Sequence, residues 1–454
     1  MIRLQIPSRS GGAFLAACAL ASFGCRAERH ATLGPIDQSA ASVPGSLIVK
    51  FRPGVRVMAD TFGIGIDATP IAPDLVPNLY LVEAGPLAGD PERWLGEIGL
   101  SDDIEYSHPD YYVYSASQQP TDADFPKQWG LEAKKQVLED GVQGDFLTTP
   151  IADIDAMRGW DVYRGEGKLT VAVVDTGLMI GAIDVQARLW KDATGKVGVD
   201  YINGGGVTND GSYTGHGTRV AMIIGAQPND AGADSVVGVT HNCKLMPLRV
   251  FNVISISGTS IQSAPVSLVI AALGYAADHG AQVINNSYGA HQISDAAGLH
   301  DAIDGLRLGG NDCLFVCAAG NTGADLAINP FYPASFDLPH MITVTSTDSN
   351  DQIPPTGRNH GVGVDLAAPG ENIYAGAKYN YGYASGTSFS TAFVSGAAAL
   401  VWEYRPKWTA AEVKQCILDS VRSAPQFTGL VESGGVLNLG NLMELAQKYP
   451  FGAP

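Results

Sequence analysis

Four side chains whose types can together carry out acyl transfer occur along the sequence in the order Asp175, His216, Asn321 and Ser388. A serine hydroxyl can attack a carbonyl carbon when a histidine accepts its proton, and a buried aspartate can orient that histidine. An asparagine amide can donate a hydrogen bond to the oxyanion that develops on the attacked carbonyl. The four residues therefore indicate nucleophilic catalysis, provided that the fold brings them together.

The sequence around the first two residues suits these roles. Asp175 directly follows the apolar run 171–174, which is typical of a buried strand, so its carboxylate can be fixed and shielded from water. Gly215 and Gly217 flank His216, and glycines let the backbone and a substrate come close to the imidazole. Taken singly, a strand-end aspartate more often caps a turn or holds a metal, and a lone histidine is more often structural.

The other two residues also have both a functional and an ordinary interpretation. Ser388 begins a stretch of small residues that is typical of a buried helix, and Asn321 follows the apolar run 313–318. Free backbone N–H groups and the positive end of the helix dipole favour negative charge at a helix start. A serine there is commonly only an N-cap, and an asparagine after a strand is commonly a turn residue. The joint occurrence of all four residues in one order favours the catalytic interpretation.

Alternating strand and helix patterns must position these side chains. Expected strands cover 169–174, 244–250, 282–286, 313–318, 341–345 and 364–367. Expected helices cover 216–225, 261–279, 295–308, 388–404 and 410–421. This alternation predicts an α/β fold with a doubly wound, mostly parallel sheet flanked by helices. Active sites of such sheets lie beyond the carboxyl ends of the strands, where Asp175 and Asn321 stand.

The three motifs together resemble the subtilisin-like serine peptidases, the subtilases. They read VAVVDTGL around Asp175, GHGTRVA around His216 and GTSFSTAFVSGAAAL around Ser388, and the resemblance covers roughly 117–447. It implies a secreted serine endopeptidase that acts on polypeptides. Ser388 would be the nucleophile, His216 the general base and Asp175 the residue that orients it. Asn321 and the Ser388 backbone N–H would form the oxyanion hole.

The resemblance also implies a substrate site. The matching positions are Ser287, Tyr288 and Gly289 for the substrate-binding strand, Ala318 and Gly320 for the S1 wall, and Phe331 for the S1 floor. The family commonly has Leu-Gly-Gly after that serine, so we expect Tyr288 to reshape the apolar subsites. We expect Phe331 to make S1 shallow, which implies broad specificity with apolar or medium-sized P1 residues.

A structural calcium ion is a further implication, while catalysis itself needs no cofactor. Asp184 stands where many subtilisins have a calcium ligand, and Asn229 falls in the matching loop. Carboxylate, amide and carbonyl oxygens suit Ca²⁺. Asp184 lacks the usual preceding His-Pro and the loop is longer, so an ordinary polar loop is the alternative interpretation.

The start of the chain predicts export. Arginines precede the apolar stretch 11–24, which is short for a membrane span. We therefore expect a signal peptide over 1–25 and a polar linker over 26–42. Cys18 and Cys25 each resemble a lipoprotein cleavage site, so lipid anchoring in the cell envelope and free extracellular secretion both stay open.

Residues 43–115 precede the peptidase region as a small α+β unit. Expected strands cover 47–51, 79–83 and 104–114, with a short helix over 91–100. The unit resembles the inhibitory propeptide of the family. That implies a zymogen whose own propeptide is an intramolecular inhibitor, removed near 115–124. Residues 132–152 are expected to form an acidic insertion, and their sequence shows no clear periodicity.

Composition limits the alternatives. The net charge of −18 argues against nucleic acid as a partner, because an acidic surface repels phosphates. A non-catalytic binding protein would require the loss of a catalytic residue, and an esterase would have the order Ser, Asp, His. A specialised processing peptidase stays open, and a monomer is the default expectation. Cys313 and Cys317 lie too far apart along an extended strand to pair, while Cys243 and Cys416 are open.

Overall fold

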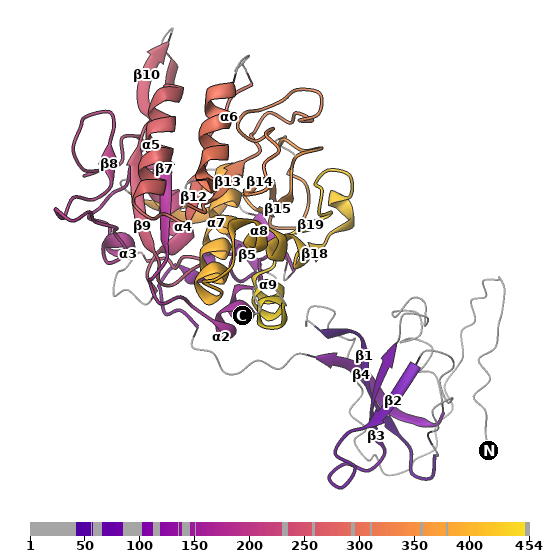
Figure 1. The fold of residues 1–454 in the computed structure, drawn as a ribbon. Helices are drawn as coiled ribbons and strands as arrows, with labels where there is room; N and C mark the ends of the chain where they lie inside the picture. The colour runs from indigo at the N-terminus through magenta and orange to yellow at the C-terminus, as the bar shows by residue number, and fades with distance from the viewer. Residues whose placement is uncertain are drawn as a thin grey trace. The chain divides into compact units, whose positions relative to one another are not determined.

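The computed structural model describes residues 42–55, 57, 66–84, 102–111, 119–134, 136–138, 146–149, 151–228, 235–256, 259–291, 296–308, 311–354, 357–377 and 380–449. The chain forms two compact units, Met1–Tyr114 and Ser115–Pro454. Each unit is described by itself (Figure 1).

The N-terminal unit contains a four-stranded antiparallel sheet in the order β2-β3-β1-β4. Its strands are β1 (Ser42–Phe51), β2 (Ile66–Pro70), β3 (Leu79–Ala84) and β4 (Ile104–Tyr111). Leu47, Val49 and Phe51 alternate along β1 and are buried together with Val82 and Ile104. Three of the strands agree with the sequence expectation, whereas β2 was not expected. The expected helix over 91–100 lies outside the described residues.

A nine-stranded sheet forms the centre of the larger unit and confirms the predicted mostly parallel α/β fold. The strand order is β18-β19-β15-β14-β13-β12-β7-β9-β8, and only the β18–β19 pair is antiparallel among the described pairings of this sheet. The strands are β7 (Thr170–Asp175), β8 (Val199–Asp200), β9 (Lys244–Arg249), β12 (Val283–Asn286), β13 (Leu314–Ala318), β14 (Met341–Thr347), β15 (Leu366–Pro369), β18 (Arg422–Ser423) and β19 (Gly435–Val436).

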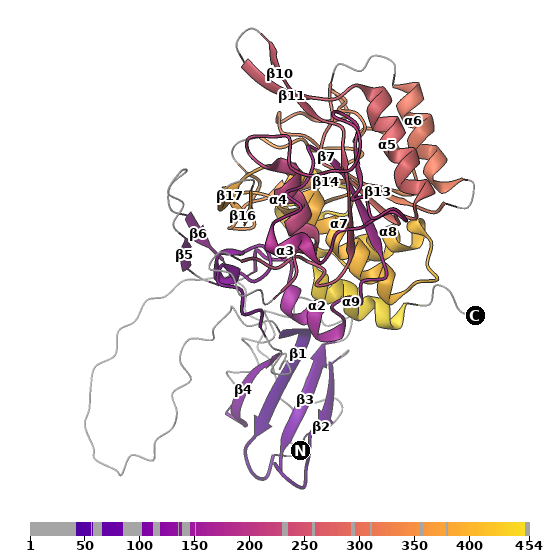
Figure 2. The ribbon, with the colours of Figure 1, turned by 90° about the vertical axis from the view of Figure 1, so that its left-hand side faces the viewer.

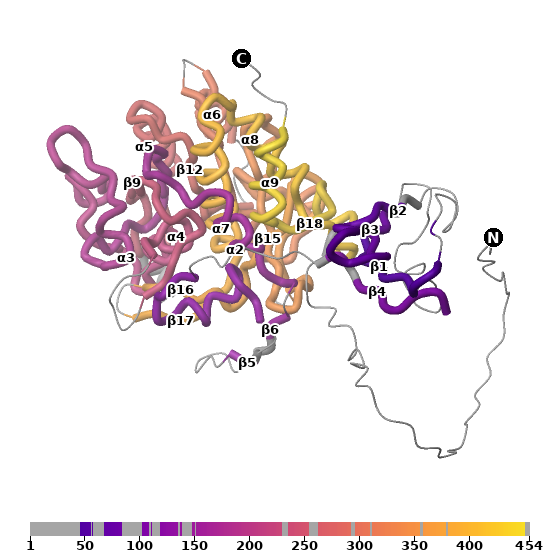
Figure 3. Tube along the Cα trace, turned by 90° about the horizontal axis from the view of Figure 1, so that it is seen from below, coloured from indigo at the N-terminus to yellow at the C-terminus, as the bar shows by residue number. Residues whose placement is uncertain are grey.

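Helices cover both faces of this sheet because its strands are apolar on both sides. Val171 and Val173 of β7 belong to one core, and Ala172 and Val174 belong to the other. Helices on the first face are α2 (Ala156–Val162), α4 (His216–Gly225), α7 (Thr387–Tyr404), α8 (Ala410–Asp419) and α9 (Leu439–Lys448). Helices on the second face are α5 (Val266–Asp278) and α6 (Ala297–Asp304), which lie side by side in Figures 1 and 2. Figure 3 shows α9 beside α8 at the end of the sheet that carries β18.

Helix α7 is the central helix of the first face. It is buried from Thr387 to Trp402, which explains its small side chains. Small residues also let α4 come close, because a Cβ at Gly396 would lie 3.0 Å from the carbonyl oxygen of Ile224. Helix α7, which carries Ser388, therefore packs closely against α4.

The helix expected over 261–279 begins later than the sequence pattern indicates. It starts at Val266, directly after Pro265, while β11 (Thr259–Ser263) pairs with β10 (Asn252–Ile256) in a hairpin. Proline disfavours helical geometry in the residue before it and suits a helix start, so it separates the two elements.

The insertion over 132–152 contains regular structure that the sequence pattern did not indicate. Two short antiparallel strands, β5 (Gln136–Leu138) and β6 (Phe146–Thr148), pair within this segment. Its strands are only three residues long, too short to leave a period in the sequence.

The four cysteines of the described residues are free and buried, namely Cys243, Cys313, Cys317 and Cys416. Burial raises the pKa of each thiol to about 12. The expectation that Cys313 and Cys317 do not pair with each other is confirmed. Among the helices that the structure describes, none combines the length and the apolar character needed to cross a membrane.

Candidate active site

Asp175 and His216 meet where the end of β7 faces the start of α4. His216 Nδ1 lies 2.8 Å from Asp175 Oδ1 and 3.0 Å from Asp175 Oδ2. Asp175 is 2% exposed, and the Thr176 N–H donates to its Oδ1 at 2.7 Å. A buried carboxylate in this position fixes the ring and leaves Nε2 as the histidine atom available for proton transfer.

Close approach of α4 to β7 makes this contact geometrically achievable. A Cβ at Gly217 would overlap the carbonyl oxygen of Gly177 and would lie 3.1 Å from Asp175 Oδ1. Gly215 has a φ of 67°, in the left-handed region that glycine adopts without strain. The two glycines that flank His216 in the sequence therefore serve backbone geometry as well as access.

The surroundings of His216 act on its pKa in both directions. Burial lowers the pKa of the imidazole, while the charge of Asp175 and its hydrogen bond raise it, and the net pKa lies above the usual value. The site thus stabilises the imidazolium, the form that histidine takes after it accepts a proton.

Ser388 is the second residue of α7 and is 8% exposed. Its Oγ donates to the carbonyl oxygen of Ser287 at 3.2 Å, and the Ser287 hydroxyl donates to the Ser388 carbonyl at 3.0 Å. The ring of Phe389 lies 5.9 Å from that of His216. No hydrogen bond joins Ser388 Oγ to His216 among the described contacts. Catalytic hydrogen bonds of this kind often tighten only when the substrate is bound.

The contacts that fix the Asn321 side chain are made by its amide oxygen and leave its amide nitrogen available. Its Oδ1 accepts the Thr387 N–H at 3.0 Å and the Thr387 hydroxyl at 3.2 Å. The Thr387 hydroxyl also accepts the Gly320 N–H at 3.2 Å. Nδ2 therefore remains the donor that can reach an oxyanion next to Ser388.

Replacing Asn321 by Ala is expected to lower kcat by about 10²–10³-fold, the loss known for such a donor in subtilisin, and to leave KM nearly unchanged. The hydrogen bond acts on the oxyanion, which exists only in the transition state. Steady-state kinetics on a chromogenic peptide measures both constants, with Asn329→Ala in the following turn as the control. A rise in KM at constant kcat would contradict this role.

A cavity of about 250 Å³ joins the catalytic pair to the expected substrate strand. It is lined by Asp175, Thr176, His216, Phe251, Gln262, Ser287, Tyr288, Gly289, Asn321 and Phe331. The structure thus gathers most of the predicted substrate residues around one space. Ala318, which is 3% exposed in β13, does not line it, and Gly320 lies behind Phe331.

Phe331 fills the space between Gly289 of the expected substrate-binding strand and Gly320 of the expected S1 wall. A Cβ at Gly289 would overlap the Phe331 ring, and a Cβ at Gly320 would lie 3.0 Å from it. Ala290 and Tyr332 exchange backbone hydrogen bonds at 2.9 Å in each direction, which fixes the segment that carries Phe331. The ring therefore narrows this end of the cavity.

Tyr288 directs its hydroxyl toward the protein. The hydroxyl donates to Asn286 Oδ1 at 2.7 Å, and the ring centre lies 5.4 Å from that of Phe251. Burial raises the pKa of Tyr288 well above its usual value, so the phenol stays neutral. Tyr288 thus presents mainly an apolar ring to the cavity.

Several residues of the site were missed in the sequence. Phe251 lies two residues after β9 and Gln262 lies in β11, and neither belongs to a catalytic motif. Thr176 and Thr387 stand directly beside Asp175 and Ser388 in the sequence, and that adjacency was the one available signal.

The calcium prediction receives no support from the described residues. Asp184 lies buried in the short helix α3 (Ile183–Gln186), where the Tyr381 hydroxyl donates to Oδ2 and the Val236 N–H donates to Oδ1 at 3.4 Å. These protein donors do not fit a carboxylate that ligates calcium. Within the described part of the chain, no three His, Cys, Asp or Glu side chains are arranged to hold a metal ion. Asn229 lies outside that part, so calcium stays a prediction.

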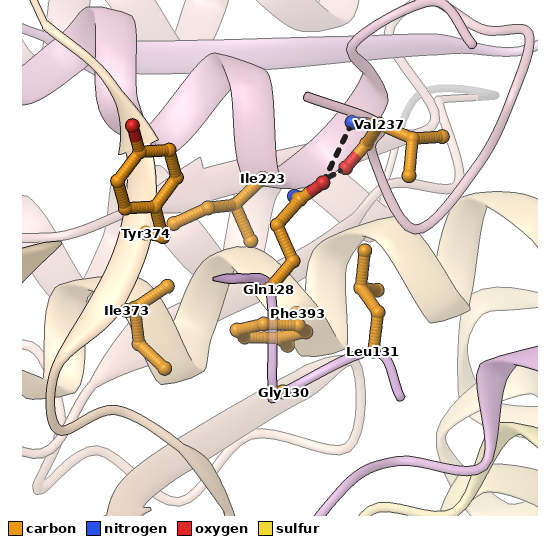
Figure 4. A pocket seen from close by; sticks show the side chains of 8 residues that line it. All are labelled: Gln128, Gly130, Leu131, Ile223, Val237, Ile373, Tyr374 and Phe393. Atoms are coloured by element: carbon orange, nitrogen blue, oxygen red, sulfur yellow. Dashed lines mark hydrogen bonds between the residues drawn. The ribbon is translucent and has the colours of Figure 1, made fainter. Parts of the chain in front are cut away.

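A second hollow lies away from the catalytic pair (Figure 4). Its volume is only about 10 Å³, and its lining is Gln128, Gly130, Leu131, Ile223, Val237, Ile373, Tyr374 and Phe393. Gln128 Nε2 donates to the Val237 carbonyl at 2.8 Å, and the Val237 N–H donates back to Oε1 at 2.9 Å. The amide thus ties two segments together through both of its polar atoms, and the hollow is a packing gap rather than a ligand site.

Comparison with known proteins identifies one family. The model of the subtilase family, Peptidase_S8, matches residues 166–439. The chain is 32% identical over 265 residues to subtilisin-like protease 2 of Plasmodium falciparum (isolate 3D7). The matched region is 57% of this chain but only 19% of that protein. The chain is 28% identical over 368 residues to the thermophilic serine proteinase of Bacillus sp. (strain AK1), with 80% and 79% covered. It is 31% identical over 262 residues to subtilisin Savinase of Lederbergia lenta, with 57% and 88% covered.

Two solved structures share the fold. A protease of Pseudoalteromonas arctica PAMC 21717 has a TM-score of 0.56 at 23% identity, over 72% of this chain and 99% of that one. The prenylagaramide maturation protease PagA has a TM-score of 0.51 at 26% identity, over 64% and 98%. The first likeness shows the fold alone. With the family match over more than half of the chain, these results show that the chain belongs to the subtilase family of serine peptidases.

Proposed function

We propose that this protein is a serine endopeptidase that hydrolyses peptide bonds through an acyl-enzyme formed on Ser388. Its membership of the subtilase family supports the reaction class. The observation that carries the assignment is the 2.8 Å contact between His216 Nδ1 and Asp175 Oδ1, beside a cavity that also reaches Asn321.

The proposed reaction uses these groups in two halves. Ser388 Oγ attacks the carbonyl carbon while His216 Nε2 accepts the hydroxyl proton, and the Asn321 amide and the Ser388 N–H stabilise the oxyanion. His216 then donates this proton to the leaving amine as the C–N bond breaks. Water attacks the remaining acyl-enzyme by the same route, with His216 again as the base.

The contacts of Phe331 support a shallow S1 site, which extends the specificity expected from the sequence. Its ring occupies space next to Gly289 and Gly320 that a large P1 side chain would need. We therefore infer a preference for apolar P1 residues of small or medium size. If the protein cleaved only one peptide sequence, that result would instead favour the alternative of a specialised processing peptidase.

Replacing Phe331 by Gly is expected to raise kcat/KM for a P1 phenylalanine substrate by about tenfold or more relative to a P1 alanine substrate. A single methylene in a hydrophobic pocket changes discrimination by about 1–3 kcal/mol, so the space of a phenyl ring is enough for a tenfold change. A P1 peptide library measures the ratio, with Phe336→Leu as the control because Phe336 packs on Tyr332 outside the cavity. An unchanged ratio in a folded variant would contradict an S1 role for Phe331.

We further propose that the chain is exported and matures by removing its own N-terminal unit. The apolar stretch 11–24 supports export. The exported protein is either secreted freely or anchored by a lipid attached to Cys18 or Cys25. The N-terminal unit has its own sheet and its own buried cluster, which suits a separate propeptide and inhibitor. We expect the mature peptidase to be a monomer.

The experiment for this proposal compares wild type and Ser388→Ala, each expressed without residues 1–25. Casein hydrolysis and intact mass are measured on both. Hydrolysis and loss of the N-terminal segment in wild type alone would support the peptidase and its self-processing. Hydrolysis by both proteins would remove Ser388 from the mechanism. Identical trimming of two inactive proteins would point to a binding protein matured by another peptidase.

A further inference from the structure

A second buried carboxylate, that of Asp210, lies next to the Asp175–His216 pair. Asp210 is 0% exposed. Its Oδ1 accepts the Thr176 hydroxyl at 2.8 Å and the Ser212 N–H at 2.9 Å. Its Oδ2 accepts the Thr218 N–H at 2.9 Å and the Thr218 hydroxyl at 2.8 Å. Each oxygen therefore receives one backbone N–H and one hydroxyl.

These contacts join the two elements that carry the catalytic pair. Thr176 directly follows Asp175, and its hydroxyl also accepts the Gly217 N–H at 3.0 Å. Thr218 lies in the first turn of α4, so Asp210 satisfies a backbone donor that the helix start leaves unpaired. The negative charge is also favourable at this end of the helix dipole. Asp210 thus clamps the end of β7 to the start of α4.

Arg219, one turn after His216, makes the second connection. Its Nη1 donates to the carbonyl oxygens of Ala375 at 3.0 Å and Gly382 at 2.5 Å, and its Nε donates to that of Thr214 at 3.4 Å. Ala375 and Gly382 face each other across the hairpin of β16 (Ile373–Gly376) and β17 (Tyr381–Ala384).

This hairpin runs directly into the segment that starts α7. The guanidinium keeps its positive charge at neutral pH. Arg219 therefore ties α4 to the part of the chain that delivers Ser388.

We propose that Asp210 and Arg219 are positioning residues that hold α4, and with it His216, in place. Asp210 ties the start of α4 to the end of β7, and Arg219 ties α4 to the hairpin before Ser388. Because the two side chains carry opposite charges, their removal should affect the protonated imidazole in opposite directions. The inference deepens the proposed function and rests on His216 being its general base.

The charges that face His216 set the sign of each effect. Burial lowers the pKa of the imidazole, Asp175 on β7 and Asp210 in the preceding loop raise it, and Arg219 on α4 lowers it. On the side of α7, the imidazole of His216 faces the uncharged ring of Phe389. Loss of the Asp210 charge should therefore lower the pKa of His216, and loss of the Arg219 charge should raise it.

The first test is Asp210→Asn. An asparagine offers only one acceptor oxygen, so its amide nitrogen has to face the N–H of either Ser212 or Thr218. We expect the acid limb of the pH profile of kcat/KM, which reports the free enzyme's base, to move to lower pH. We also expect kcat/KM at the optimum to fall by about 10²-fold, the effect of misplacing a catalytic group by about 1 Å.

The second test uses two substitutions of Arg219. Arg219→Met removes the charge, so the acid limb should move to higher pH, opposite to the effect of Asp210→Asn. Arg219→Lys keeps the charge, so its acid limb should stay near that of wild type. Its kcat/KM should fall, because one ammonium nitrogen cannot replace both Nη1, which donates to Ala375 and Gly382, and Nε, which donates to Thr214. Arg307→Met, which removes an arginine paired with Asp304, is the control and should leave the profile unchanged.

Titration of the His216 imidazole by NMR separates this inference from the proposed function. It is done in the full chain carrying Ser388→Ala, with the signal assigned by its loss in His216→Gln. Opposite shifts for Asp210→Asn and Arg219→Met would support the inference even if the wild-type chain hydrolysed nothing. Acid limbs and titrations that stay unmoved, or that move in the same direction, would overturn it. If Asp210→Asn does not fold, the two Arg219 variants decide the question by the direction of their shifts.

Discussion

Replacing Ser388 by Ala is expected to lower kcat for a peptide substrate by about 10⁶-fold, a loss of the order known for the nucleophile of subtilisin. The hydroxyl is the only group proposed to form the covalent intermediate, while the buried helix that carries it stays intact. The lost contact is a single hydrogen bond to the Ser287 carbonyl, so the melting temperature should change little. Active-site kinetics on a chromogenic peptide and thermal unfolding measure the two effects.

Ser390 provides the matched control for this substitution. It lies in the same helix, is 0% exposed, and its hydroxyl contacts Ser346 Oγ and the Ala368 carbonyl at 2.9 Å each. Ser390→Ala should therefore lower stability by about 1 kcal/mol for a lost buried hydrogen bond and leave kcat within a few-fold. Equal activity losses in both variants would mean that the helix start, and not the Ser388 hydroxyl, matters.

Replacing Asp175 by Asn is expected to lower kcat by about 10⁴-fold, as the equivalent change does in another serine peptidase triad. The amide can present a donor to His216 Nδ1, which then has to accept and so places its proton on Nε2. In that tautomer the imidazole cannot take the serine proton. Loss of the Asp175 charge also removes an interaction that raises the pKa of His216.

Kinetics across pH measures both consequences of this change. The variant should keep a KM close to that of wild type and should recover part of its activity at high pH, where hydroxide replaces the missing base. Asp192→Asn, on an exposed loop where the carboxylate contacts Thr194, is the control and should be nearly neutral. A loss smaller than tenfold for Asp175→Asn would contradict a triad at this site.

Local signals in the sequence predicted the central part of the site. The apolar run before Asp175 gave the end of β7, and the helix expected over 216–225 matches α4 residue for residue. Both predictions succeed because burial on both faces and flanking glycines leave direct marks in the residues concerned. The order in which Asp175 and His216 are followed by Asn321 and Ser388 then favoured the catalytic interpretation.

Other parts of the site depend on contacts between segments far apart in the chain. The residues around Phe331 do not themselves show that its ring will lie against Gly289 and Gly320, and only the family resemblance predicted its place at S1. The hydroxyl of Tyr288 turns inward because Asn286 offers an acceptor. The early start expected for α5 shows a related failure, since helical periodicity continued through Ile261 although Pro265 separates β11 from the helix.

Covalent labelling of the nucleophile tests the central claim most directly. Phenylmethylsulfonyl fluoride transfers its sulfonyl group to an activated serine oxygen as the S–F bond breaks, and intact mass with peptide mapping locates the adduct. We expect one adduct on Ser388 in the wild-type chain, parallel loss of peptidase activity, and no adduct in Ser388→Ala or His216→Ala. An adduct on another residue, or full inhibition without any adduct on Ser388, would contradict the assignment of Ser388 as the nucleophile.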